Sequence, residues 1–175
     1  MKKLNKLSVL ALTSLFILSS CETTELDLTS NPNALSPENA SVDLFINNVQ
    51  EDFANFVNSM GDVGARLTRI AQMSGDRMYQ DAYSPSSFSG VWSSAYQGMM
   101  EDLRVMNGIA AENGLTYHIG MGQVMQAYIL MTLVDYFGDV PYTEALLGAE
   151  NLNPAADSGQ SVYNSALGLL DSAIS

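Results

Sequence analysis

The chain has 175 residues, with seven basic against nineteen acidic ones and a formal net charge of −12 at pH 7. Such an acidic surface is repelled by nucleic-acid phosphates and by anionic lipid headgroups, so we expect no nucleic-acid partner and no peripheral electrostatic membrane binding. Apolar residues make up 47% of the chain and recur periodically, which argues against disorder.

The N-terminal segment predicts export and lipidation. Lysines fall within the first six residues, an apolar run extends from Leu7 to Leu18, and small residues precede Cys21. Leu18-Ser19-Ser20-Cys21 resembles the bacterial lipoprotein signal, in which the chain is cut before the cysteine and its sulfur is lipidated. We therefore predict a signal peptide over residues 1–20 and acyl chains such as palmitate at Cys21. The alternative is an ordinary signal peptide in which Cys21 falls by chance.

The predicted mature chain is more acidic than the whole. All nineteen acidic residues follow Cys21, whereas three of the seven basic residues precede it, so the mature charge is 4 − 19 = −15. A neutral ligand or a partner protein suits this charge best. Residues 21–37 combine acids, Asn and Pro without periodicity, and we interpret them as the lipidated cysteine and a tether.

The folded part is expected over residues 38–175, beginning with a helix. Apolar residues recur at steps of three or four, which places them on one face: Val42, Phe45, Val49, Phe53, Phe56 and Met60. Ser36-Pro37 fits the start of this helix and Gly61 its end. A second, shorter helical pattern (Val63, Leu67, Ile70) follows.

Residues 74–90 interrupt the helical period with Gly, Ser and Pro, and predict a loop. This loop is our candidate for ligand contact, because aromatic rings stack on the apolar face of a sugar while charged side chains bond its hydroxyl groups. The candidate contacts are Arg77, Tyr79, Asp81, Tyr83 and Phe88. The alternative, and the commoner fate of such rings, is to pin a long loop onto the helices.

The next helix carries apolar residues at steps of 4, 3, 4, 3 and 4 and ends at Asn113-Gly114: Trp92, Tyr96, Met99, Leu103, Met106 and Ala110. Their place in this stripe predicts that Trp92 and Tyr96 are buried. His118 stands alone, without a cysteine or a second histidine near it, so we predict no metal site and a helix-start or surface position. No complete phosphate-binding glycine motif occurs, and we expect no cofactor.

A helix from about Gly122 to Phe137 is uncharged almost throughout, yet it is too short for a membrane span and includes polar residues. Gly138 and Pro141 predict a sharp corner, with Asp139 bonding nearby backbone amides. Tyr136, Phe137 and Tyr142 are expected to pack this corner. An amphipathic segment from Ser161 to Ile174 predicts the final helix.

No useful strand-like alternation occurs, so the predicted fold is all-α, with stacked pairs of antiparallel helices like a helical-repeat solenoid. The tetratricopeptide spacing itself is not matched, because Trp92, Ala127 and Pro141 do not fall at its positions.

Several motifs occur together in a fixed order. They are the lipoprotein signal at Cys21, a LDLTSNPN tether at Leu26 to Asn33, the WxxxY helix at Trp92, the DYFGDVPYTEAL corner at Asp135 to Leu146, and a YxxxLxxLDxAI helix at Tyr163 to Ile174. In this combination the chain resembles the SusD/RagB family of outer-membrane nutrient-binding lipoproteins, in particular its SusD-like, starch-binding branch. The resemblance concerns the N-terminal portion of the family only, since its members are roughly three times as long.

The resemblance implies a tetratricopeptide-like α-superhelix, here incomplete. It also implies a lipid-anchored protein on the cell surface at the outer membrane, which binds oligosaccharide or polysaccharide nutrients and delivers them to a TonB-dependent transporter of the SusC type. A peptide- or other nutrient-binding lipoprotein of the same fold, and a structural helical lipoprotein without a ligand, remain alternatives.

An enzyme is not expected. A glycoside hydrolase needs two carboxylates that face one bond at a defined separation. Asp135, Asp139 and Glu144 are the carboxylates to consider, and nothing in the sequence places them opposite each other.

Overall fold

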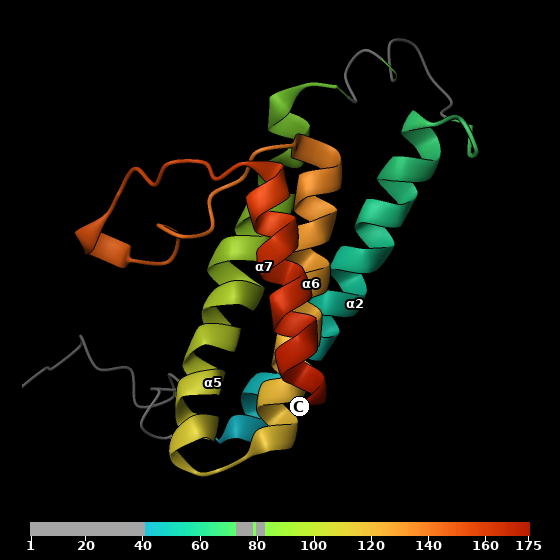
Figure 1. Ribbon diagram of the computed structural model, residues 1–175. Coiled ribbons are helices and arrows are strands. Elements are labelled where there is room, and N and C mark those ends of the chain that lie inside the picture. The colour runs from blue at the N-terminus through green and yellow to red at the C-terminus, as the bar shows by residue number, and fades with distance from the viewer. Residues whose placement is uncertain (1–40, 73–78, 80–82) are drawn as a thin grey trace, which may run out of the picture. The chain divides into compact units, whose positions relative to one another are not determined.

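The computed structural model describes residues 41–72, 79 and 83–175 (Figure 1). The predicted signal peptide, Cys21 and tether, together with Arg77 and Asp81, lie outside the described residues. The described part is all-α, as predicted. Its elements are α2 (Val42–Leu67), the 3₁₀ helix η1 (Pro85–Phe88), α4 (Ser89–Trp92), the π-helix η2 (Ser93–Met100), α5 (Glu101–Glu112), α6 (Thr116–Phe137), the 3₁₀ helix η3 (Gly148–Glu150) and α7 (Gly159–Ile174).

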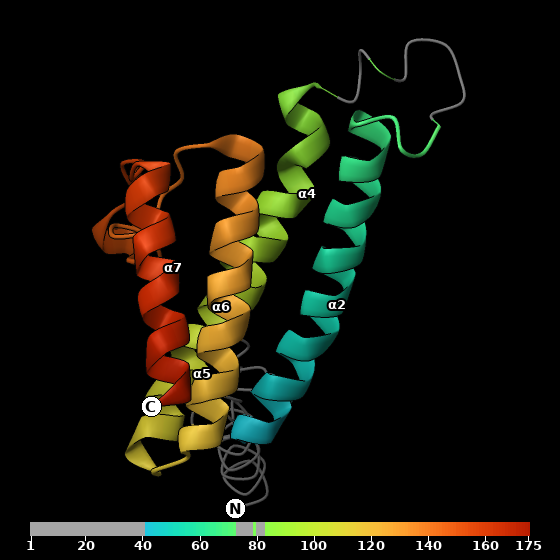
Figure 2. The same cartoon turned by 45° about the vertical axis from the view of Figure 1, so that its right-hand side comes forward.

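Helix α6 lies between α2 and α7, and α5 packs behind it (Figures 1 and 2). The colours of Figure 1 show that α5 and α6 run in opposite directions, as do α6 and α7. The core between these helices contains fully buried side chains from η2, α5 and α6: Met99, Leu103, Met106, Ile129, Leu130 and Leu133. The apolar stripe predicted between Trp92 and Ala110 therefore faces a core that it shares with the uncharged helix α6.

Helix α2 is longer than the sequence pattern indicated. It begins after Ser41, whose hydroxyl caps the Leu44 amide at 3.3 Å, and it continues through Gly61 to Leu67. The predicted end at Gly61 is wrong: a glycine inside a helix costs only about 1 kcal/mol relative to alanine, and partial burial of Val63 and Leu67 beyond it offsets this cost. The second predicted pattern is the end of the same helix, and Ile70 beyond it is 85% exposed.

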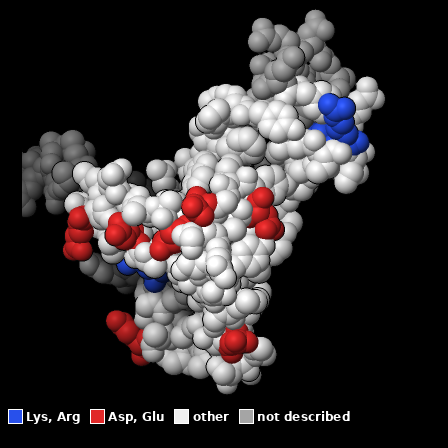
Figure 3. All heavy atoms as spheres, turned by 45° about the horizontal axis from the view of Figure 1, so that its top comes forward, with Lys and Arg blue, Asp and Glu red and all other residues white. Residues whose placement is uncertain are grey.

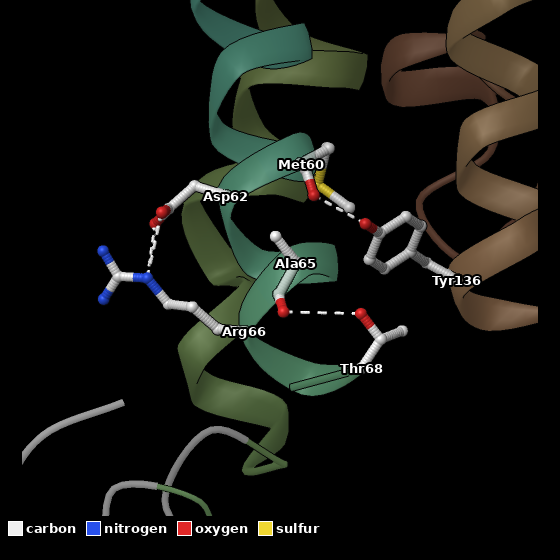
Figure 4. A network of polar contacts seen from close by, with 6 residues as sticks. All are labelled: Met60, Asp62, Ala65, Arg66, Thr68 and Tyr136. Carbon is white, nitrogen blue, oxygen red and sulfur yellow. Dashed lines mark hydrogen bonds and ion pairs between the residues drawn. The ribbon is translucent and has the colours of Figure 1, made fainter. Parts of the chain in front are cut away.

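A tyrosine connects α6 to this part of α2. The Tyr136 hydroxyl donates to the Met60 carbonyl at 2.5 Å, as Figure 4 shows. Burial raises the pKa of Tyr136, which keeps the phenol a neutral donor. The contact is tight, because a Cβ added at Gly64 would collide with the Tyr136 hydroxyl. A side chain at position 64 would therefore displace the Tyr136 hydroxyl.

Helix α6 begins at Thr116, six residues before the predicted start. His118 lies in its first turn, as predicted, and its Nε2 is 3.0 Å from Oδ1 of Asp43 at the start of α2. The helix ends at Gly138, which has a φ of 80° and a ψ of −110°. The positive φ agrees with a glycine terminator, but the ψ differs from that of the left-handed helical cap. Among the described helices, none is long and apolar enough to cross a membrane.

Candidate functional site

The aromatic residues of the predicted ligand loop have different surroundings. Tyr83 is 66% exposed, whereas Phe88 in η1 is half-buried and meets the Phe137 ring edge to face at 5.2 Å. The Arg69 guanidinium lies 5.2 Å from the ring centroid of half-buried Tyr79. Phe88 thus pins its segment onto α6, while Tyr83 presents a ring to solvent.

Phe88 is the first member of a row of aromatic rings. Phe137 also contacts Trp92 at 4.8 Å between centroids, and Trp92 stacks on Tyr96 at 5.5 Å with an interplanar angle of 13°. Trp92 and Tyr96 pack against the core, as their place in the apolar stripe predicted. They are only half-buried, however, so the prediction that they are buried holds in part, because both rings also line an open pocket.

This pocket, of about 820 Å³, has two walls of different character. One wall is the continuous helical run from α4 through η2 into α5, and π turns of this kind are frequent at functional sites. The other wall is the segment from Pro141 to Pro154. The lining residues are Trp92, Tyr96, Gln97, Glu101 and Arg104 on the helical wall, and Pro141, Ala145, Leu146, Leu147, Gly148, Glu150 and Pro154 on the loop wall.

The helical wall holds an ion pair at its polar end. Arg104 donates to both carboxylate oxygens of Glu101, from Nε at 2.9 Å and from Nη2 at 2.6 Å. These hydrogen bonds lower the pKa of Glu101 and raise that of Arg104, so the pair stays charged. Both side chains are substantially exposed, at 37% and 55%, which leaves them accessible from the pocket.

Asp157 holds the base of the loop wall. Its Oδ2 accepts the Tyr142 and Thr143 amides, each at 2.9 Å, and its Oδ1 accepts the Thr143 hydroxyl at 2.8 Å. Its backbone pairs with Val140 as an isolated antiparallel bridge. The hydrogen bonds from Thr143, ahead of the one from Tyr142, lower the pKa of Asp157. The charged carboxylate of Asp157 therefore joins the two ends of the loop through these hydrogen bonds.

Tyr96 fastens the loop wall to the helical wall. Its hydroxyl donates to the Pro141 carbonyl at 2.6 Å. Burial, and to a lesser extent the charge of Asp157, raises the pKa of Tyr96 well above its ordinary value. The phenol therefore remains a donor, and the corner after Gly138 is tied to η2. Of the aromatics predicted to pack this corner, Phe137 contacts Trp92 and Tyr142 packs against the core.

The three carboxylates considered for catalysis accept hydrogen bonds within the chain. Asp135 accepts from the Tyr163 hydroxyl, and Asp139 accepts from the Gly159 amide at 2.9 Å. Glu144 accepts from the Ala155 amide at 3.0 Å and from Asn151 at 3.1 Å. Asp139 does bond a backbone amide, as predicted, but the amide lies twenty residues further along the chain and begins α7.

A second pocket, of about 900 Å³, lies where the start of α6 meets the end of α7. Its lining is largely apolar and uncharged, and includes the exposed side chains of Tyr117, Met121, Val124 and Ile174. In the part of the chain that the structure describes, no group of His, Cys, Asp and Glu could hold a metal ion.

The sequence reasoning missed the first pocket. The sequence did contain an indication of the helical wall, because Trp92 and Tyr96 form an aromatic pair four residues apart. No local sequence pattern indicated the loop wall, because the hydrogen bonds of Asp157 and Tyr96 join residues 14 to 45 positions apart in the chain.

Comparisons with known proteins agree with the fold. The family model described as "SusD-like, starch-binding associating with outer membrane" matches residues 32–175. A crystal structure of a SusD/RagB family protein from Bacteroides thetaiotaomicron is similar with a TM-score of 0.58 and 21% sequence identity. The similarity covers 73% of this chain and 29% of that protein, so this chain spans less than a third of that protein's length. Curated proteins gave no match. By the match over residues 32–175, the chain belongs to the SusD-like family.

Proposed function

We propose that this protein is anchored at the outer membrane through a lipidated Cys21, binds an oligosaccharide or polysaccharide nutrient at the cell surface, and delivers it to a TonB-dependent transporter of the SusC type. The observation that carries this proposal is the family match over residues 32–175. The lipoprotein-like signal before Cys21 supports the anchor, and the acidic composition favours a neutral ligand such as a glycan.

The proposed ligand contacts of the 74–90 loop are Arg77, Tyr79, Asp81, Tyr83 and Phe88. Exposed Tyr83 is the best supported of them, because a free ring face is what stacking on a sugar requires. Phe88 acts by holding the segment against Phe137. We propose binding without catalysis, since Asp135, Asp139 and Glu144 each accept hydrogen bonds from the chain itself.

Isothermal titration of the purified full-length protein against a panel of neutral and acidic oligosaccharides tests ligand binding. We expect heat with at least one glycan, and a weaker affinity for Tyr83→Ala. The control is Tyr117→Ala, because Tyr117 is also a highly exposed tyrosine and lies in the second pocket. Heat with peptides and none with any glycan would replace glycan binding by peptide binding, and heat with neither class would favour a structural lipoprotein.

The anchor and the partner need a cellular test. Metabolic labelling with palmitate should mark the wild type and leave Cys21→Ser unlabelled, and the variant should lose its place in the outer-membrane fraction. Affinity purification from detergent-solubilised membranes should recover a TonB-dependent receptor. Labelling of the Cys21→Ser variant would contradict the proposed anchor.

A further inference from the structure

The pocket between the α4–η2–α5 run and the Pro141–Pro154 segment is not used by the proposed contacts of the 74–90 loop. Its lining combines two kinds of chemistry: Tyr96 on the helical wall and Leu146 on the loop wall supply apolar surface, whereas the helical wall also supplies hydrogen-bonding groups from Gln97, Glu101 and Arg104. A pyranose ring has the matching pattern, with C–H groups on its faces and hydroxyl groups around its rim. An apolar peptide side chain would displace water from these polar groups without forming hydrogen bonds to them.

The polar groups of the pocket retain unused bonding capacity. A guanidinium has five N–H donors, and two of those on Arg104 go to Glu101, which leaves three. Each Glu101 oxygen still has a lone pair available for a hydroxyl donor. Gln97 is exposed and lies one turn before Glu101. Donors and acceptors thus follow one another along the helical wall, as vicinal hydroxyl groups require.

The charge of the pocket selects against acidic ligands. Arg104 is the only basic residue among its lining residues, and Glu101 already neutralises it, while Glu150 adds a negative charge on the opposite wall. In the view of Figure 3 the acidic side chains are spread over the face and the basic ones gather at two places. A uronate or sulfated sugar would meet net negative charge here.

We propose that this pocket is a binding site for one unit of a neutral oligosaccharide, additional to the contacts of the 74–90 loop, with the sugar ring against Tyr96 and Leu146 and its hydroxyl groups on Gln97, Glu101 and Arg104. This inference rests on the proposed glycan-binding function. Leu146 has a φ of 62°, a strained value for a residue other than glycine, and such strain is typically kept where the position of a side chain matters.

Two pairs of variants of the full-length protein test the pocket by titration with neutral oligosaccharides of glucose, mannose, galactose and xylose, and with oligogalacturonides of equal length. Arg104→Ala removes donors and should weaken neutral glycan binding about tenfold. Arg66→Ala is its control, because Arg66 forms a similar surface pair with Asp62 outside the pocket and should leave the affinity unchanged. Ala145→Phe fills the pocket and should weaken binding further, whereas Ala111→Phe on the exposed face of α5 should not.

Trp92 provides a readout that does not depend on a variant. It is the only tryptophan of the chain and lines the pocket, so its fluorescence reports on occupancy. Neutral glycan should shift the emission to shorter wavelength and protect Trp92 from acrylamide quenching.

The outcomes separate the two proposals. Glycan binding that Arg104→Ala and Ala145→Phe leave unchanged, with unchanged Trp92 fluorescence, overturns the pocket assignment and leaves the proposed function intact. Equal or tighter binding of oligogalacturonides overturns the selection for neutral sugars. If the pocket variants abolish binding of a hydrophobic peptide and not of glycans, the site is a peptide-docking site. Absence of binding to every glycan overturns the proposed function and this inference together.

Discussion

The two walls of the pocket are held in place by different forces. The helical wall is backed by side chains with no exposed surface, among them Met99, Leu103 and Met106, so apolar burial fixes it. The loop wall is fixed by hydrogen bonds to carboxylates, chiefly those of Asp157 and Glu144. Substitutions in the core and changes in pH should therefore act on different walls of one site.

The largest effect is expected in the core behind the helical wall. Leu103→Ala removes a fully buried side chain of α5 and should lower the free energy of unfolding by about 2–5 kcal/mol. Urea denaturation followed by circular dichroism measures this. The control is Leu167→Ala on α7, where the side chain is 52% exposed and little apolar burial is lost. Equal losses for the two variants would show that the α5 contact does not support the fold as described.

The packing between α5 and α6 gives the next largest effect. A Cβ added at Gly122 would lie 2.9 Å from both Oδ1 of Asn107 and Cε of Met106, so Gly122→Ala overfills the contact and should cost about 1–3 kcal/mol. At Gly108, also helical, a Cβ meets nothing within 4 Å, and Gly108→Ala should stabilise by up to about 1 kcal/mol. Thermal melting of both variants measures the difference, and a stabilised Gly122→Ala would mean that the helices separate easily.

The helices could be predicted from the sequence, and the pocket could not. The spacing of Met99, Leu103 and Met106 can be read from the local sequence. It predicted the apolar stripe whose side chains are buried in the core. The end of α2 was missed because propensity at Gly61 is a weak local effect, and the tertiary contact of Tyr136 with Gly64, beyond Gly61, overrides it.

The site required contacts that no local pattern contains. Single-sequence reasoning placed Trp92 in the core, and the structure places it between the core and a pocket whose second wall comes from residues about fifty positions later. The role of Asp157 likewise depends on its hydrogen bonds with Tyr142 and Thr143, which lie fifteen and fourteen positions earlier in the chain.

The hydrogen bonds that hold the loop wall should respond to pH, whereas the apolar packing behind the helical wall should not. Because the pKa of folded Asp157 lies below its ordinary value, its stabilising bonds are complete above about pH 4 and are lost as the pH falls through the lowered value. Amide exchange of Tyr142 and Thr143, corrected for intrinsic rates, should therefore quicken in acid, while buried amides of α6 stay protected. In Asp157→Asn the dependence on pH should disappear. Retention of the full dependence in that variant would assign it to another carboxylate.

The smallest effect on stability is expected at the ion pair of the helical wall. Exposed pairs contribute about 0–1 kcal/mol, so a double-mutant cycle with Glu101→Gln and Arg104→Gln should give a coupling within this range, as should a cycle with Asp62 and Arg66. High salt should reduce both couplings.

The effect of the same substitutions on stability should then be compared with their effect on ligand affinity. If the two pairs are equal for stability but only the Glu101–Arg104 pair affects glycan binding, its position on the pocket rather than its strength explains its role. A large stabilising coupling at Glu101–Arg104 would instead make the pair a structural support of α5.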